Sequence, residues 1–207
     1  MKRKLISTAA LLAAFLLPAA HTEGTDIPMV RIPGKNYEMG KTEVTQGQWK
    51  AVMGENPSFF DKCGDNCPVE RVSWDDAQKY IQKLNAKTGK QYRLPSEDEW
   101  EYACHGDSQS EYCGGGNVDA VAWYEDNSKE KTHAVGFKQA NGYGLYDMSG
   151  NVWEWVENCY DGDCAKRVVR GGSWKYIPQF ARAAFRFRFD SADRLDDSGF
   201  RLARTLP

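Results

Sequence analysis

Apolar residues recur at two different spacings, and the two spacings occupy different parts of the chain. After Ser73, the residues Ala77, Tyr80, Ile81 and Leu84 are spaced three and four apart, which places them on one face of a helix. In the second half, short runs alternate between apolar and polar residues, as strands do. The pattern predicts two or three helices followed by a twisted antiparallel sheet, which is an α+β domain.

Local signals place the ends of these elements. Three helices are expected to begin at capping boxes, in which Ser or Thr is followed three residues later by an acid or an amide. The three boxes are Thr45 with Gln48, Ser73 with Asp76, and Ser96 with Glu99. Residues 27–39 predict two strands around a turn, and residues 104–144 predict mostly loop. Later strands are predicted at residues 152–156, 168–174, 181–189 and 199–204.

The first residues have the composition of a secretory signal peptide. Three basic residues precede an apolar run at residues 5–17 and the small residues 18–20. A membrane anchor is the alternative, but the run is too short to span a bilayer comfortably. We therefore expect a signal peptide at 1–20, a short disordered start at 21–26 and one domain at 27–207. This predicts an exported protein that is periplasmic, secreted or at the cell surface, with no transmembrane segment after cleavage.

The chain contains six cysteines. An even number in an exported protein favours disulfides, and local pairing is preferred because each local pair brackets a turn rich in Gly or Asp. The preferred pairs are Cys63 with Cys67, Cys104 with Cys113, and Cys159 with Cys164. A zinc site is the alternative, although the spacings repeat no C-x2-C pattern. The sequence does not fix the connectivity.

Overall charge excludes some partners. The formal net charge is -2, so nothing points to nucleic acid as a partner. The three histidines, His21, His105 and His133, form no recognisable ligand motif. No Ser/His/Asp or Cys/His arrangement for nucleophilic catalysis is apparent.

Seven segments, taken in order, carry a family resemblance. They are residues 29–34 (MVRIPG), 43–45 (EVT), 68–74 (PVERVSW), 92–103 (YRLPSEDEWEYA), 141–155 (NGYGLYDMSGNVWEW), 170–174 (RGGSW) and 199–201 (GFR). Together they resemble the formylglycine-generating enzyme family, also called the sulfatase-modifying factor family. Its domain is a variant of the C-type lectin fold. The resemblance implies that irregular, loop-rich fold for nearly all of residues 27–207.

One departure from the family bears on catalysis. The enzyme carries two redox cysteines after the RGGSW segment, where they bind copper and oxidise a cysteine of a target protein. Residues 175–185 contain neither Cys nor His here, so copper, which needs such ligands, is not expected. This departure therefore favours a non-catalytic module that binds a ligand or a protein. The alternative is a protein-modifying oxidoreductase of the same type, which would have to recruit Cys159 and Cys164 instead.

The resemblance also implies a calcium loop with a structural role. Hard oxygen ligands suit calcium, and family matching assigns side chains to Asp147 and Glu154 and backbone carbonyls to Gly150 and Val152. In the alternative interpretation, Asp147 caps a turn and Glu154 pairs with an arginine. The sequence does not decide between the two.

The stretch at 175–197 places aromatic residues among arginines. If residues 183–189 form a strand, Phe185, Phe187 and Phe189 share one face, while Arg186 and Arg188 share the other. The phenylalanine face could pack in the core, or it could bind a ligand, because aromatic and Arg side chains dominate interface energetics.

The same stretch resembles the variable region of proteins diversified by retroelements, several of which use this lectin-like domain. Such regions arise by mutation of adenines in asparagine codons, which reaches codons for Tyr, Ile, Phe, Asp and Leu; Lys175 does not fit the simplest version. The resemblance implies a binding face for an unknown protein or surface ligand. That face would comprise Tyr176, Ile177, Phe180, Phe185, Phe187, Phe189, Asp193, Leu195, Asp196 and Asp197. A reverse transcriptase gene and an adenine-differing copy of this segment in neighbouring DNA would test the idea.

Overall fold

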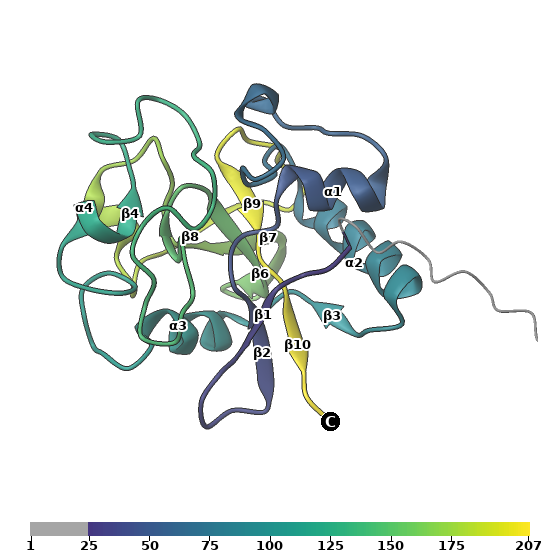
Figure 1. Ribbon diagram of the computed structural model, residues 1–207, viewed down its shortest axis with the longest axis horizontal. Helices are drawn as coiled ribbons and strands as arrows, with labels where there is room; N and C mark the ends of the chain where they lie inside the picture. Colours follow the sequence, from purple (N-terminus) through teal and green to yellow (C-terminus); the bar gives the residue numbers. More distant parts are fainter. Residues whose placement is uncertain (1–24) are drawn as a thin grey trace, which may run out of the picture.

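The computed structural model describes residues 25–207. The expected signal peptide and most of the expected disordered start lie outside these residues. Figure 1 shows α1 (Gln46–Met53) and α2 (Trp74–Thr88) side by side on one flank, with α3 (Glu97–His105) on another side of the central sheets. A short α4 (Val118–Val121) and two 3-10 turns, η1 (Asp61–Cys63) and η2 (Pro178–Ala181), lie within the long connections. The predicted α+β class is confirmed.

Each long helix begins where the sequence predicts. All three capping boxes are formed, with the Ser or Thr side chain accepting from the backbone three residues on and the reciprocal bond also present. α1 and α2 end at Gly54 and Gly89, whose φ angles of 92° and 69° lie in the left-handed region. Glycine adopts this conformation without steric cost and so ends the helix.

The strands form three small sheets. One contains β1 (Met29–Arg31), β2 (Tyr37–Gly40), β10 (Ala203–Thr205) and β3 (Tyr92–Arg93), in that order. Another has the order β8 (Arg186–Asp190), β7 (Asp163–Arg170), β6 (Trp153–Tyr160) and β9 (Ser198–Phe200). β4 (Ala122–Trp123) and β5 (Ser149–Gly150) pair in parallel.

Three of the strand predictions need correction. The strand predicted at 168–174 ends at Arg170, because Gly171 and Gly172 turn the chain with φ angles of 91° and 76°. Within the strand predicted at 181–189, only the last part is strand, since the chain first passes through η2. The strand predicted at 199–204 is divided between β9 and β10, which belong to different sheets.

Large buried aromatic side chains make up much of the core. Trp100, Trp153 and Trp155 are fully buried, and Trp49 stacks on Tyr80 with ring centroids 5.2 Å apart. Each buried indole removes a large apolar area from water. A few large aromatic residues therefore supply much of the buried apolar area, which the short strands could not supply alone.

Three disulfides close local loops. The structure joins Cys63 to Cys67, Cys104 to Cys113, and Cys159 to Cys164. This is the local pairing preferred from the sequence. Within residues 25–207, no helix is long and apolar enough to cross a membrane.

Candidate binding surface

One face of the β8–β7–β6–β9 sheet carries a cluster of aromatic side chains. We call it the aromatic patch and define it as the five rings Tyr176, Phe180, Phe185, Phe187 and Phe189, together with the exposed aliphatic residue Ile177, which follows Tyr176 directly in the chain. Phe187 pairs with Val169 in the β7–β8 register, and Val169 pairs with Trp155 in the β6–β7 register. Directly paired residues of neighbouring strands point to the same side of a sheet. The phenylalanines of β8 therefore lie on the same side of the sheet as the buried tryptophans of β6 and pack against them.

Trp153 is the centre of the aromatic patch. Its ring centroid lies 5.8 Å from that of Tyr176, 6.0 Å from Phe187 and 6.2 Å from both Phe185 and Phe189. The outer rings also touch one another, as in Phe180 with Phe185 at 4.8 Å. The five aromatic rings of the patch thus form one contiguous surface over a fully buried indole.

The aromatic patch is neither core nor free surface. Ile177 remains 47% exposed and Phe187 remains 40% exposed, whereas the other four members are half-buried. Only five large hydrophobic residues in the described part of the chain are exposed to this degree, and two of them belong to the patch. A monomer seldom exposes several large apolar side chains together unless something binds there.

The opposite face of β8 carries charge, as the alternation predicts. The guanidinium carbons of Arg186 and Arg188 lie 4.6 Å and 4.8 Å from the centroid of the Tyr160 ring. Arg186 also pairs with Glu97 and Asp161. These arginines contact neighbouring residues on one face of β8, while Phe187 and Phe189 lie on the opposite face, against Trp153.

Backbone bonds fix the start of the aromatic patch. The Trp174 N–H donates to the carbonyl of Asn151, and the Glu125 N–H donates to the carbonyl of Tyr176. A side chain at Gly172 would place its Cβ 2.9 Å from the carbonyl oxygen of Phe180. Glycine is therefore required at position 172, where the chain passes close to η2. Tyr176 follows four residues later and packs against Trp153.

The acidic end of the predicted face differs from the expectation. Asp197 is fully buried, accepts a hydrogen bond from Ser173, and has a pKa raised by burial. Its assignment to an outward surface is therefore wrong. Asp193 accepts from the backbone N–H of Asp190 and caps a turn, while Leu195 and Asp196 are half-buried in the same loop. These three residues belong to the loop between β8 and β9 and not to the aromatic patch.

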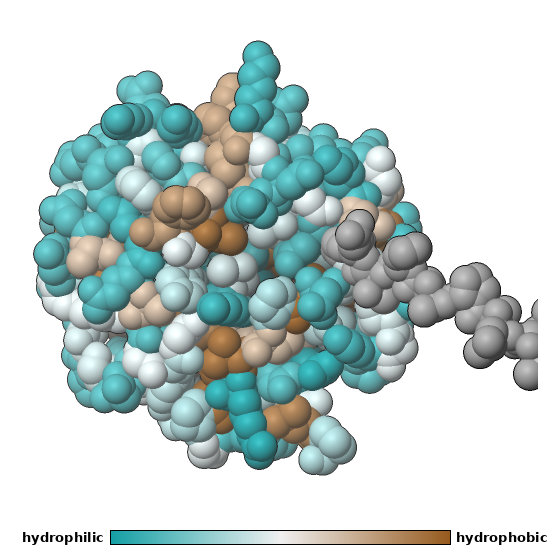
Figure 2. Space-filling view, in the orientation of Figure 1, coloured by the Kyte–Doolittle hydropathy of each residue, from teal (hydrophilic) through white to brown (hydrophobic). Residues whose placement is uncertain are grey.

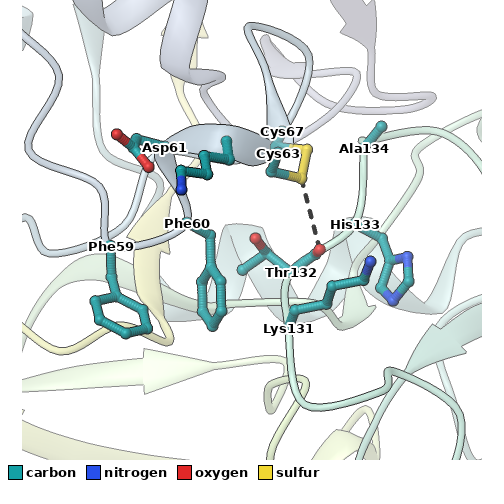
Figure 3. A pocket seen from close by; sticks show the side chains of 10 residues that line it. Phe59, Phe60, Asp61, Cys63, Cys67, Lys131, Thr132, His133 and Ala134 are labelled. Atoms are coloured by element: carbon teal, nitrogen blue, oxygen red, sulfur yellow. Dashed lines mark hydrogen bonds between the residues drawn. A yellow bond between two sulfur atoms is a disulfide. The ribbon is translucent and has the colours of Figure 1, made fainter.

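Two cavities that share a wall have no counterpart in the sequence-based predictions. Phe59 and Phe60 project together from the segment leading into Asp61, as Figure 3 shows. On one side they line a cavity of about 590 Å³ with the Cys63–Cys67 disulfide, Thr132 and other residues. On the other side they line a cavity of about 410 Å³, which contains Trp174 and Lys175. Figure 2 shows apolar side chains in small groups among the mostly hydrophilic side chains of one face.

A buried carboxylate holds this shared wall in place. The two carboxylate oxygens of Glu70 accept the backbone N–H groups of Phe59 and Phe60, each at 2.9 Å. Burial raises the pKa of Glu70 to about 7. The wall is therefore positioned by a side chain from the segment before α2, which is distant in sequence from the aromatic patch.

The predicted calcium loop lies in a cluster of buried charges. Glu154 receives 2.6 Å and 2.7 Å hydrogen bonds from Arg201, and the Trp100 indole N–H donates to it at 2.6 Å. The alternative interpretation of Glu154, pairing with an arginine, is therefore what the structure shows. Glu43, which the sequence did not single out, accepts from Asn151. Burial and the nearby Asp147 raise its pKa well above the ordinary value.

Calcium fits part of this cluster. One oxygen of Asp147 accepts from the Gly136 N–H, but its Oδ1 is buried without a hydrogen-bond partner, and burial raises the pKa of Asp147 to about 6. Three carboxyl groups, those of Glu43, Asp147 and Glu154, lie near one guanidinium, that of Arg201, and burial disfavours the charged forms of Glu43 and Asp147. A divalent cation beside these carboxyl groups would favour their ionised forms. Within the described part of the chain, however, no three His, Cys, Asp or Glu side chains are grouped to hold a metal.

The region where the family enzyme keeps its redox cysteines is occupied differently. Tyr176, Ile177 and Phe180 stand there and contribute to the aromatic patch. Cys159 and Cys164, the pair that an oxidoreductase could recruit, are bonded to each other where β6 turns into β7. In residues 25–207 every cysteine is part of a disulfide.

The fold and this surface define a C-type-lectin-like domain with an aromatic face. The family model described as sulfatase-modifying factor enzyme 1-like domain matches residues 13–206. The chain therefore belongs to this family, as the sequence motifs predict.

Three similar proteins illustrate what the family contains. The chain is 33% identical over 227 residues to the chaperone protein LppX of Paenibacillus barcinonensis, covering 82% of the chain and 80% of the relative. It is 35% identical over 145 residues to inactive C-alpha-formylglycine-generating enzyme 2 of Bos taurus, covering 63% of the chain and 46% of that relative. Among solved structures, Treponema denticola variable protein 1 aligns with a TM-score of 0.76 at 29% identity, covering 87% of this chain and 92% of that one.

Proposed function

We propose that this protein is a non-catalytic binding module, exported to the periplasm or cell surface, whose aromatic patch holds an apolar segment of a partner protein. The observation that carries the proposal is the arrangement of the patch around Trp153, with Ile177 and Phe187 left open to solvent. Aromatic anchors of this kind dominate the energetics of protein interfaces. Three disulfides are compatible with an extracellular location.

The family contains relatives named formylglycine-generating enzyme as well as one named inactive, and the names of three similar proteins favour this proposal. One relative is named a chaperone and another an inactive enzyme, so neither name describes catalysis. A structural neighbour is named a variable protein, which agrees with a C-terminal face whose residues differ from protein to protein. On this proposal, the aromatic patch is a surface that can be changed without disturbing the fold.

The proposal is tested with peptides selected from a random library for binding to the wild-type protein. Replacing Ile177 and Phe187 together with alanine is expected to weaken binding of the selected peptides by at least tenfold, since each hot-spot truncation typically costs more than about 1 kcal/mol. Binding is measured by isothermal titration calorimetry. The melting temperature of the variant should fall by only a few degrees, because both side chains are partly exposed.

Phe137→Ala is the matched control, since Phe137 is 76% exposed and lies outside the aromatic patch. It should leave peptide affinity unchanged. Equal loss of affinity in the control and the double variant would contradict a specific patch, and so would no loss in either.

The alternative function, oxidation of a target cysteine, is tested separately. A sulfatase-type cysteine peptide incubated with the protein and added copper should remain unoxidised on this proposal. Turnover that disappears when Cys159 or Cys164 is replaced by serine would establish the oxidoreductase instead.

We also propose that Asp147 binds calcium in a structural role, with carbonyls of Gly150 and Val152 as the family-matched partners. Chelation of the metal-loaded protein should lower its melting temperature by about 5–10 °C, the shift expected when free calcium was 100 times its Kd. Asp147→Asn should remove the difference, whereas Asp126→Asn, at an exposed position, should preserve it. A melting temperature that chelation leaves unchanged would show that the Asp147 loop is only a turn.

A further inference from the structure

The smaller cavity lies beside the aromatic patch and has a chemistry of its own. It measures about 410 Å³ and is lined by aromatic rings together with acidic side chains. We propose that it receives the cationic side chain, arginine or lysine, of the partner segment that the patch holds. This inference rests on the proposed function, because it assigns a second chemical feature to the same partner.

Aromatic rings form the walls of the cavity. The centroid of Phe60 lies 5.4 Å from that of Trp174, with the two rings perpendicular, and 5.0 Å from that of Phe59. The Trp174 indole N–H donates to the carbonyl of Asp196, which fixes its ring. The faces of aromatic rings attract cations.

Cations of the chain itself already lie on two of these rings. The Arg71 guanidinium is 4.7 Å from the centroid of Phe59, and the Lys175 ammonium is 5.8 Å from the centroid of Trp174. Phe60 carries no cation among the described residues. Its ring therefore remains available in the shared wall between the two cavities.

The charges around the cavity favour a positive occupant. Glu125, Glu130 and Asp196 line it, against a single Lys175. Lys175 is already paired, at 3.0 Å with Asp196 and 3.2 Å with the buried Asp197. Glu125 and Glu130 are exposed and form no ion pair within residues 25–207. Two acidic side chains are thus left to receive a cation beside aromatic walls.

The cavity and the aromatic patch adjoin through the backbone. Lys175 lines the cavity, and the next residue, Tyr176, begins the patch. The Glu125 N–H donates to the Tyr176 carbonyl at 3.1 Å, so an acidic residue of the cavity is tied directly to the patch. A partner segment seated on the aromatic rings would therefore bring a neighbouring side chain to the acidic cavity.

The ligand class is tested with arginine amide as the probe and citrulline amide as its neutral isostere. Arginine amide is titrated into the wild-type protein while the Trp174 indole N–H resonance is followed by NMR. We expect saturable shifts with arginine amide and none with citrulline amide over the same concentrations. Glu125→Gln combined with Glu130→Gln should weaken the binding at least fivefold, and Phe60→Leu should weaken it about twofold to fivefold, the range for a cation on a ring near the surface.

Matched controls separate this inference from the proposed function. Glu55→Gln changes an exposed acid outside the cavity and should leave arginine amide binding unchanged. The Ile177→Ala, Phe187→Ala double variant should also bind arginine amide normally. If this double variant no longer binds the peptides but still binds arginine amide, both proposals are supported.

Three results would overturn the cation site. One is equal binding of citrulline amide and arginine amide. Another is unchanged affinity in the Glu125→Gln, Glu130→Gln variant, and the third is no movement of the Trp174 resonance. Any of these outcomes leaves the aromatic patch standing, because its own test uses different residues and a different probe.

Discussion

Replacing Arg201 with methionine is expected to lower the free energy of unfolding by about 3–5 kcal/mol, the usual cost of removing one partner of a buried ion pair. Arg201 is fully buried and donates to Glu154 and to the carbonyls of Gly40 and Tyr146. Without it, Glu154 would remain buried beside Glu43 and Asp147, with no positive charge among them. Urea denaturation followed by tryptophan fluorescence measures the loss.

Two further variants test whether the broken ion pair causes this loss of stability. Arg31→Met removes an exposed arginine on β1 and should change stability by no more than about 0.5 kcal/mol. Replacing Arg201 and Glu154 together with methionine should cost less than the sum of the two single changes, because neither member of this ion pair is then left buried without the other. A cost below about 1 kcal/mol for Arg201→Met would contradict the role given to this pair.

Replacing Trp153 with alanine is expected to cost about 3–5 kcal/mol, the range for a buried aromatic side chain. Trp153 has no exposed surface and contacts all five aromatic rings of the patch. Phe187→Ala is the natural comparison, since it removes a ring from the same cluster at a position that is 40% exposed. That change should cost about 1 kcal/mol, because much of the ring is already in water.

The difference between these two costs tests how the aromatic patch is built. Both are measured by urea denaturation under identical conditions. If Phe187→Ala cost as much as Trp153→Ala, the phenylalanine face would belong to the core and could not serve as a binding surface.

Much of the fold follows from local sequence signals. The three capping boxes specify where α1, α2 and α3 begin, because both partners of each box lie within four residues. Likewise, strict alternation placed the phenylalanines and arginines of β8 on opposite faces. The ends of strands were less well predicted. Arg201 lies between β9 and β10, where the chain leaves one sheet for another, and its guanidinium donates to Glu154, Gly40 and Tyr146, which are all distant in sequence.

Candidate site residues were predictable only where the residues that form the site lie close together in the sequence. The aromatic patch was found because most of its members lie close together on the chain, around η2 and β8. Asp197 was misplaced because its burial depends on Ser173 and Lys175, which come from another loop. Phe59, Phe60 and Glu70 gave no signal, since the smaller cavity that Phe59 and Phe60 line also needs Trp174 and the loop that carries Glu125 and Glu130.

The central claim is that the aromatic patch touches the partner. The most direct test places a photo-crosslinking phenylalanine analogue at position 187, with position 137 as the control, and irradiates each protein with the peptides selected on the wild type. Both positions hold exposed phenylalanines in the native protein, so the analogue should be tolerated at each. The account predicts efficient cross-linking from 187 and little from 137. Cross-linking from 137 but not from 187 would contradict it.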